Sequence, residues 1–245
     1  MKTFAITIIN FLRAPRVLIA ILVWGKKNNI SIGFKRLNNI VLILNLTVNN
    51  SRLKIEVGKL VSIIFEIDKY IDSLNIKDKG FQKKVKTLLK MSRFKELIKG
   101  SFQNSGSEYY QSILSRLENL IKSDLTAQLT NDPDIYLRYA KFSIGYYCIA
   151  TILCLNLKQN YNETFVSNSS LLIRIMSDIS TYKKDIDEER KNILLWKSTK
   201  NMLIQVKKLY ELIKKYEPTN ETESSLKKIT LFTFKFYKKG KDFEI

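Results

Sequence analysis

Glycine and proline are scarce in this chain, with 8 glycines and 3 prolines among 245 residues. Tight turns depend on these two residue types, so a fold built from many short strands and turns is disfavoured. Apolar residues instead recur at helical spacing over long segments, most clearly from Ser107 to Leu125. These features predict an all-α fold with a single domain over residues 1–245.

Helical periodicity covers most of the chain and predicts eight to ten helices. The longer ones are expected at residues 31–46, 53–74, 81–98, 107–125, 135–157, 171–191, 192–216 and 221–237, with polar loops at 100–106 and 159–169. Asp132 and Pro133 suit the N-cap and first turn of a helix. The segment 135–157 is apolar nearly all round, so it should be the most buried helix.

The N-terminal segment 4–24 is apolar except where Arg13, Pro15 and Arg16 divide it into two runs. Neither run is long enough to span a bilayer. We expect two short helices there, which either pack on the core or rest at a membrane interface.

Histidine is absent, which excludes histidine nucleophile activation, histidine general bases and histidine metal ligands. The two cysteines, Cys148 and Cys154, lack zinc-site and redox-motif spacing, so they are expected to be core residues of a cytoplasmic protein. The net charge of +19 has two interpretations. It reflects either a functional basic surface for a polyanion or a lysine excess spread over solvated faces.

Two sets of oxygen-bearing side chains repeat every four residues. Asp68 and Asp72 form the first set, and Ser177, Thr181 and Asp185 form the second. On an α-helix this spacing places each set on one face. Magnesium prefers oxygen ligands, so two such faces across a helical bundle predict a site for Mg²⁺ and a diphosphate.

The segment RIMSDISTYKKD resembles the second metal-binding motif of class I terpene synthases, NDxxSxxxE. In this resemblance Ser177 replaces the asparagine, Thr181 the serine and Asp185 the glutamate. Asp178 is retained, and Arg174 and Lys184 occupy positions that often carry basic residues in the family.

Two earlier segments resemble the family in the same order. DKYID is similar to the aspartate-rich motif DDxxD, with Phe65 at a position that often lines the cavity floor. IYLRYAKFSIG is similar to the pattern at the bend of the family's central helix. There Lys141 stands at the diphosphate-sensing position, Arg138 is one turn away, and Gly145 stands at the helix break.

The resemblance implies the class I isoprenoid synthase fold and a Mg²⁺-dependent terpene synthase that ionises a linear C20 or C15 prenyl diphosphate. It implies three Mg²⁺ ions held by Asp68, Asp72, Ser177 or Asp178, Thr181 and Asp185. The diphosphate would meet Lys141, Arg138, Arg174, Lys184 and Tyr237, the last with Lys235 or Lys238. Aromatic rings stabilise a carbocation by cation–π attraction, and the candidates are Phe65, Phe142, Tyr146, Trp196 and Phe232.

The sequence departs from the family at several ligands and leaves other readings open. Lys69 stands in the aspartate-rich motif, and Ser177 and Asp185 are shorter than the usual ligands. A catalytically impaired relative and a squalene or phytoene synthase relative are alternatives. A basic helical protein that binds nucleic acid or an anionic membrane is the alternative of another class. With the enzyme reading we expect no nucleic acid partner, peripheral membrane contact at most, and a monomer or homodimer.

Overall fold

The structure is a computed structural model that describes residues 15–30, 50–74 and 76–239. Within these residues the chain is helical and contains no strand. The α-helices are α2 (Pro15–Lys27), α4 (Ser51–Asp72), α5 (Phe81–Lys86), α6 (Ser92–Phe102), α7 (Ser107–Leu129), α8 (Pro133–Ser143), α9 (Tyr146–Leu157), α10 (Glu163–Asp187), α11 (Thr199–Lys215) and α12 (Glu221–Lys239). The all-α prediction is confirmed.

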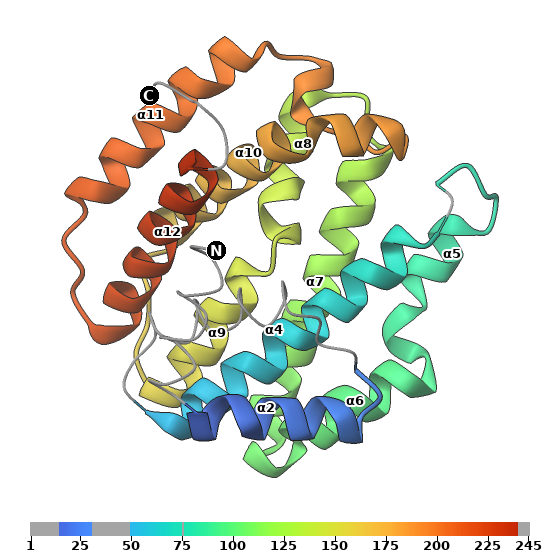
Figure 1. The fold of residues 1–245 in the computed structure, drawn as a ribbon, viewed down its shortest axis with the longest axis vertical. Helices are drawn as coiled ribbons and strands as arrows, with labels where there is room; N and C mark the ends of the chain where they lie inside the picture. The colour runs from blue at the N-terminus through green and yellow to red at the C-terminus, as the bar shows by residue number, and fades with distance from the viewer. Residues whose placement is uncertain (1–14, 31–49, 75, 240–245) are drawn as a thin grey trace.

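Helix α9 lies at the centre of the bundle. It contacts α4, α7, α10 and α12, and residues 146–153 are all buried. Figure 1 shows α4 crossing the view diagonally. Helices α10 and α12 pack on α9, and α11 packs on α10 and α12. Of the segment 135–157, which was expected to be the most buried helix, the second half is central and buried, whereas α8 (Pro133–Ser143) in the first half exposes Arg138 and Tyr139.

The central segment is broken at Gly145, between α8 and α9, where the axis bends by 42°. Gly145 has a φ of 74°, a left-handed conformation that favours glycine. A Cβ atom at this position would lie 2.9 Å from Cδ1 of Ile64 on α4. Both the backbone conformation and the close approach of α4 therefore require a glycine at the predicted break.

Side-chain caps define two helix starts. Asp132 accepts hydrogen bonds from the backbone N–H groups of Asp134 and Ile135, as its N-cap prediction requires. Asn162 caps α10 by accepting from the N–H of Phe165 at 3.0 Å. Helix α10 consequently begins at Glu163, inside the segment 159–169 that was expected to be a loop.

Two other predicted helices are subdivided. Segment 81–98 forms α5, the 3₁₀ turn η1 (Leu88–Lys90) and the start of α6, with Met91 extended between the last two. In one continuous helix Phe94, Leu97 and Ile98 would lie roughly half a turn around from Phe81, Val85 and Leu88. The break lets both apolar sets, Phe81, Val85, Leu88, Phe94, Leu97 and Ile98, reach the same core.

The segment expected as one helix over 192–216 begins instead with the 3₁₀ turn η3 (Ile193–Leu195). Helix α11 starts only at Thr199, where Ser198 accepts from the N–H of Asn201. Asn192 uses its side chain to bind Asp178 and Asp185, which holds this stretch against α10.

Helix α2 is the described part of the apolar N-terminal segment. It packs on α4 and buries Val17, Leu18 and Ile21, as the core-packing alternative predicted. Among the described residues no single helix is both long and apolar enough to cross a membrane, although α8 and α9 taken together reach that length and composition. The helix predicted at 31–46 and the first part of segment 4–24 lie outside the described residues.

Candidate functional site

A cavity of about 340 Å³ lies where α4, α7, α10 and α12 meet the α8–α9 break. The C-terminal half of α4 and the second half of α10 provide most of its polar wall. The lining residues are Phe65, Asp68, Ile71, Asp72, Asp124, Gln128, Ser143, Ile144, Ile173, Arg174, Ser177, Thr181, Lys184, Asp185, Arg190, Lys191 and Tyr237. Four acidic and four basic side chains thus line the cavity. Their charges balance, whereas the chain as a whole has a net charge of +19.

The two sets of oxygen-bearing side chains predicted from four-residue spacing, called the oxygen ladders from here on, line this same cavity. Asp68 and Asp72 enter from α4, and Ser177, Thr181 and Asp185 enter from α10. These segments are more than a hundred residues apart in sequence, so only the tertiary fold brings them together. The Mg²⁺ and diphosphate site predicted from them stays a prediction.

Asp185 is held in place by two hydrogen bonds to one of its oxygens. The Thr181 hydroxyl donates to Oδ2 at 2.7 Å, and Nδ2 of Asn192 donates to the same oxygen at 2.7 Å. This arrangement fixes the rotamer of Asp185 and makes Thr181 its support within the ladder.

Asp72 lies between two cations from the end of α10 and the loop that follows. Nη2 of Arg190 is 3.1 Å from Oδ1 of Asp72, and Nζ of Lys184 is 3.7 Å from Oδ2. Lys184 was predicted to contact the diphosphate, whereas Arg190 was not singled out by its sequence. The two ion pairs connect α4 to α10 across the cavity.

Arg174 joins the cavity wall to a buried network behind it. Its Nη2 atom is 2.8 Å from Oδ1 of Asp178 and donates to the Tyr136 hydroxyl at 2.5 Å. Burial opposes its charge, but the Asp178 carboxylate raises the pKa of Arg174, so the guanidinium stays charged. Its buried Nε has no hydrogen-bond partner among the described residues.

Asp178 itself is fully buried and does not line the cavity. Its Oδ2 atom accepts from the Tyr136 hydroxyl at 2.9 Å and from the N–H of Ile193 at 3.3 Å. The alternative that Asp178 rather than Ser177 serves as the metal ligand is therefore corrected. Asp178 orients Arg174, and Ser177 is the residue that faces the cavity.

Sequence reasoning missed Asp124, Gln128, Ser143, Arg190 and Lys191. Burial raises the pKa of Asp124, the Asp72 carboxylate adds to this shift, and Arg174 and Arg190 oppose it. A second four-residue spacing on α7, between Asp124 and Gln128, was the available signal. Arg190 and Lys191 lie in a loop without periodicity, and no sequence signal marked them.

The predicted diphosphate sensor does not reach the cavity. Arg138 is exposed on α8. Nζ of Lys141 donates to the Ser167 hydroxyl at 2.7 Å, and burial lowers the pKa of Lys141. The rotation of α8 within the bundle turns both side chains away, and Arg174 and Arg190 are the guanidiniums that line the wall. At the C-terminal end Tyr237 lines the cavity, but Lys235 and Lys238 are exposed.

Of the predicted aromatic residues, Phe65 lines the cavity and four others do not. Tyr146 is buried, and its hydroxyl donates to the carbonyl oxygen of Leu226 on α12. Phe142 packs on Tyr147 with ring centroids 4.7 Å apart. Trp196 packs on Tyr136 at 5.6 Å, and Phe232 lies five residues before Tyr237, on a different face of α12.

The cavity offers oxygen donors of the kind that Mg²⁺ prefers. Within the described ranges no three acidic side chains lie close enough together to hold a metal ion alone. Magnesium in nucleotide-processing sites commonly takes one or two carboxylates and completes its shell with water and substrate phosphate oxygens. Asp68 and Asp72 on α4, and separately Asp185 with the hydroxyls of Ser177 and Thr181 on α10, each offer the one or two carboxylates of that pattern.

Two comparisons with known proteins gave no match. No protein-family model matches the chain, and no curated protein sequence matches it.

Proposed function

We propose that this protein is a class I terpene synthase that ionises a linear prenyl diphosphate of 15 or 20 carbons and cyclises the resulting cation. The observation that carries this proposal is that both oxygen ladders and three basic side chains, Arg174, Lys184 and Arg190, line one cavity. This matches the chemistry of a diphosphate leaving group, which needs oxygen ligands for metal ions and cations for its own charge.

In the proposed reaction the bond between the allylic carbon and the diphosphate oxygen breaks, and the electron pair leaves with the diphosphate. Bound Mg²⁺ would supply positive charge to that leaving group. Asp68 and Asp72 would hold one group of metal ions, and Asp185 with Ser177 and Thr181 a further ion. Arg174 and Lys184 would donate hydrogen bonds to diphosphate oxygens.

The carbocation that remains needs an apolar wall without competing water. Phe65, Ile144, Ile173 and Tyr237 provide that part of the lining. The faces of Phe65 and Tyr237 would stabilise positive charge by cation–π attraction. Transfer of a proton from the cyclised cation to the released diphosphate would then give a neutral hydrocarbon.

The direct test incubates purified protein with Mg²⁺ and prenyl diphosphates of 10, 15, 20 and 25 carbons. Hydrocarbon products are measured by gas chromatography and released diphosphate by a coupled assay. Asp68→Ala and Asp185→Ala should abolish turnover without changing the circular dichroism spectrum. Asp187→Ala is the matched control, because Asp187 is exposed at the end of α10 and does not line the cavity. Absence of hydrocarbon and of diphosphate release with all four substrates would refute the proposal.

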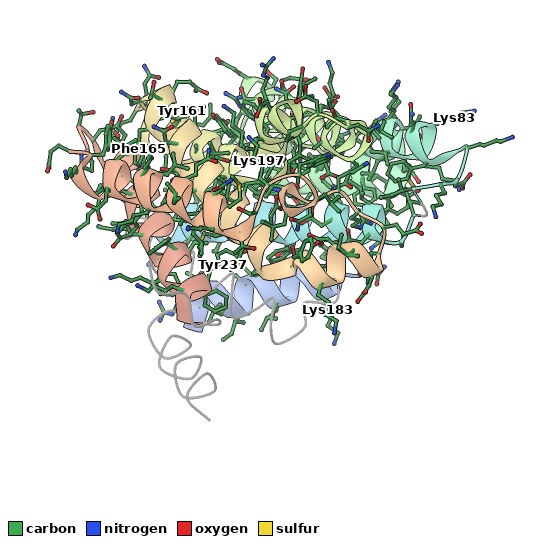
Figure 2. All side chains as sticks on the ribbon, turned by 90° about the horizontal axis from the view of Figure 1, so that it is seen from above. Lys83, Tyr161, Phe165, Lys183, Lys197 and Tyr237 are labelled. Carbon is green, nitrogen blue, oxygen red and sulfur yellow. The ribbon has the colours of Figure 1, made fainter. Side chains whose placement is uncertain are left out.

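A second candidate function, contact with an anionic membrane surface, is favoured by the segment from Lys77 to Lys99. It contains nine basic and two acidic residues, a net charge of +7, and all nine basic side chains are exposed. Figure 2 shows Lys83 projecting from one end of the molecule. Clusters of this density on helices bind anionic lipid headgroups.

Flotation with vesicles that contain or lack anionic lipid tests this second candidate. Replacing Lys83, Lys86 and Lys90 with glutamate should abolish binding to anionic vesicles. The same change at Lys200, Lys207 and Lys208, three exposed lysines of α11, is the control and should weaken binding far less. Equal losses in the two triple variants would assign the effect to net charge alone.

A further inference from the structure

Arg190 is positioned by the way α10 ends. Glu189 has a φ of 56°, and the N–H of Arg190 donates to the carbonyl oxygen of Asp185 at 2.7 Å. This is the hydrogen-bond pattern of a Schellman cap, in which glycine is the usual residue at the left-handed position. The cap fixes the Arg190 backbone relative to Asp185, one of the candidate metal ligands, and leaves its long side chain to select a partner.

In the structure that partner is Asp72. The Arg190 residue is 8% exposed, and its Nη2 atom lies 3.1 Å from Oδ1 of Asp72 and 3.1 Å from the carbonyl oxygen of Ile71. Its Nε atom is 3.4 Å from Oε2 of Glu188. The guanidinium therefore occupies the side of Asp72 that faces the end of α10.

Lys184 adds a second cation to the same group of carboxylates. Its Nζ atom is 3.7 Å from Oδ2 of Asp72 and 3.6 Å from Oε2 of Glu188. A metal ion that binds Asp72 must therefore displace two positive charges or share the carboxylate with them. Repulsion between like charges at this range opposes the binding of the metal alone.

A diphosphate in the cavity would offer these displaced cations a new partner. Guanidinium groups bind phosphate oxygens through two parallel hydrogen bonds, which is a stronger arrangement than a single contact to one carboxylate oxygen. We infer that Arg190 blocks Asp72 in the ligand-free protein and transfers to the diphosphate when Mg²⁺ and diphosphate bind together. This inference rests on the proposed function, since it concerns the same cavity.

The exchange makes the two ligands cooperative. Diphosphate draws Arg190 and Lys184 away from Asp72, so the affinity for Mg²⁺ rises, and by thermodynamic linkage Mg²⁺ raises the affinity for diphosphate by the same factor. Removing the guanidinium should have opposite effects on the two ligands. It frees Asp72 for the metal and deprives diphosphate of a donor.

Isothermal titration calorimetry with Mg²⁺ alone, inorganic pyrophosphate alone and both together tests this prediction. In Arg190→Gln the affinity for Mg²⁺ alone should rise about twofold to fivefold, as expected for the loss of one competing ion pair. The affinity for pyrophosphate should fall at least about tenfold, since a charged bidentate donor is lost. The coupling between the two ligands should shrink accordingly.

Lys183→Gln is the matched control, because Lys183 is exposed on α10 beside Lys184 and points away from the molecule in Figure 2. It should leave both affinities unchanged. If Arg190→Gln does not fold, as judged by circular dichroism, the same titrations with Lys184→Gln test the inference. That variant should show the same opposed changes with about half the logarithmic size, because its contact to Asp72 is longer.

The outcomes separate the inference from the proposed function. If the wild-type protein binds neither Mg²⁺ nor pyrophosphate, both are overturned. If the wild-type protein binds both ligands but the folded variant loses affinity for both, Arg190 is only structural and the exchange is overturned. Unchanged affinities in the folded variant would also overturn it.

Discussion

The two ends of α4 each carry an acidic side chain that bonds to other helices, but the partners differ in kind. Near the N-terminal end, Glu56 is 7% exposed and accepts from the Tyr109 hydroxyl at 2.5 Å and from Nδ2 of Asn156 at 3.0 Å. At the C-terminal end the Asp72 side chain is 44% exposed and contacts the cations Arg190 and Lys184. From other helices Glu56 accepts only neutral donors, and its one cationic partner is Arg52 on its own helix at 3.4 Å, whereas Asp72 lies at the wall of a cavity.

This difference separates a structural carboxylate from an exchangeable one. Burial and the Glu56 carboxylate both raise the pKa of Tyr109, so its hydroxyl stays protonated and remains a donor. No charged ligand could replace such donors without leaving them unsatisfied in the interior. Around Asp72 the partners are long cationic side chains next to a cavity, and these can transfer to an incoming anion.

The largest expected effect is on catalysis, at the C-terminal end of α4 where Asp72 lies at the cavity. Asp72→Ala should lower turnover of a prenyl diphosphate about 1000-fold or more, because electrostatic stabilisation of the leaving group is lost. Its free energy of unfolding should change by less than about 1 kcal/mol, since the Asp72 side chain is 44% exposed and Arg190 keeps its contacts with Glu188 and the carbonyl oxygen of Ile71. Product analysis and urea unfolding measure the two quantities. Turnover within tenfold of the wild type would remove the distinction between the two ends.

The next largest effect is on stability, near the N-terminal end of α4 where Glu56 is buried. Glu56→Ala should lower the free energy of unfolding by about 3 kcal/mol, because it leaves Tyr109 and Asn156 without their shared acceptor in a buried site. Turnover per folded molecule should stay near the wild-type value. Urea unfolding followed by circular dichroism gives the stability. A loss below about 1 kcal/mol would show that Glu56 is less essential to packing than its contacts indicate.

Both ends of α4 show which features the sequence could predict. Helical spacing fixes which side chains share a face within one helix, and so it correctly grouped Asp68 with Asp72 and Ser177 with Asp185. The break at Gly145 was predicted from the family resemblance, and the reason for it is local: a left-handed φ and the contact with Ile64.

The rotation of one helix against its neighbours is a tertiary property, and there the sequence failed. Lys141 and Arg174 were both predicted to contact a diphosphate, yet only Arg174 lines the cavity, because α8 presents Lys141 to Ser167. Arg190 was missed since its place depends on a helix cap with glutamate where glycine is usual. The sequence also did not show that segment 81–98 breaks so that its two apolar sets reach the same core.

A third effect concerns Arg174, which lines the cavity and also bonds to the buried residues Asp178 and Tyr136. Tyr136→Phe removes the hydroxyl that accepts from Arg174 and donates to Asp178. We expect a loss of about 2 kcal/mol in the free energy of unfolding, because two buried charged groups each lose a partner. KM for the prenyl diphosphate should rise about threefold to tenfold, while kcat changes less, since Arg174 remains charged but is less well oriented. Steady-state kinetics measures this split, and an unchanged KM would limit Tyr136 to a structural role.

The smallest effect extends the comparison to a third acidic residue, Glu223, which is buried and bonded to backbone donors. Its oxygens accept from the N–H groups of Asn162 and Thr219, each at 2.8 Å, and so join the starts of α10 and α12. Burial acts to raise the pKa of Glu223, but these hydrogen bonds, with those from the Tyr216 and Thr219 hydroxyls, outweigh it, so the pKa lies below its ordinary value.

A carboxyl whose pKa is lower in the folded state stabilises the protein above its unfolded-state pKa, and that contribution is lost as the pH falls through the folded-state pKa. Urea unfolding between about pH 6 and pH 3 should therefore show a decrease in stability on the acid side that Glu223→Gln lacks. At neutral pH we expect Glu223→Gln to cost about 1 kcal/mol, since a neutral amide is a weaker acceptor than a carboxylate. Glu221→Gln, at an exposed position on the first turn of the same helix, should keep the wild-type pH dependence. Parallel pH profiles for wild type and Glu223→Gln would mean that the Glu223 carboxylate does not contribute to the pH dependence of stability.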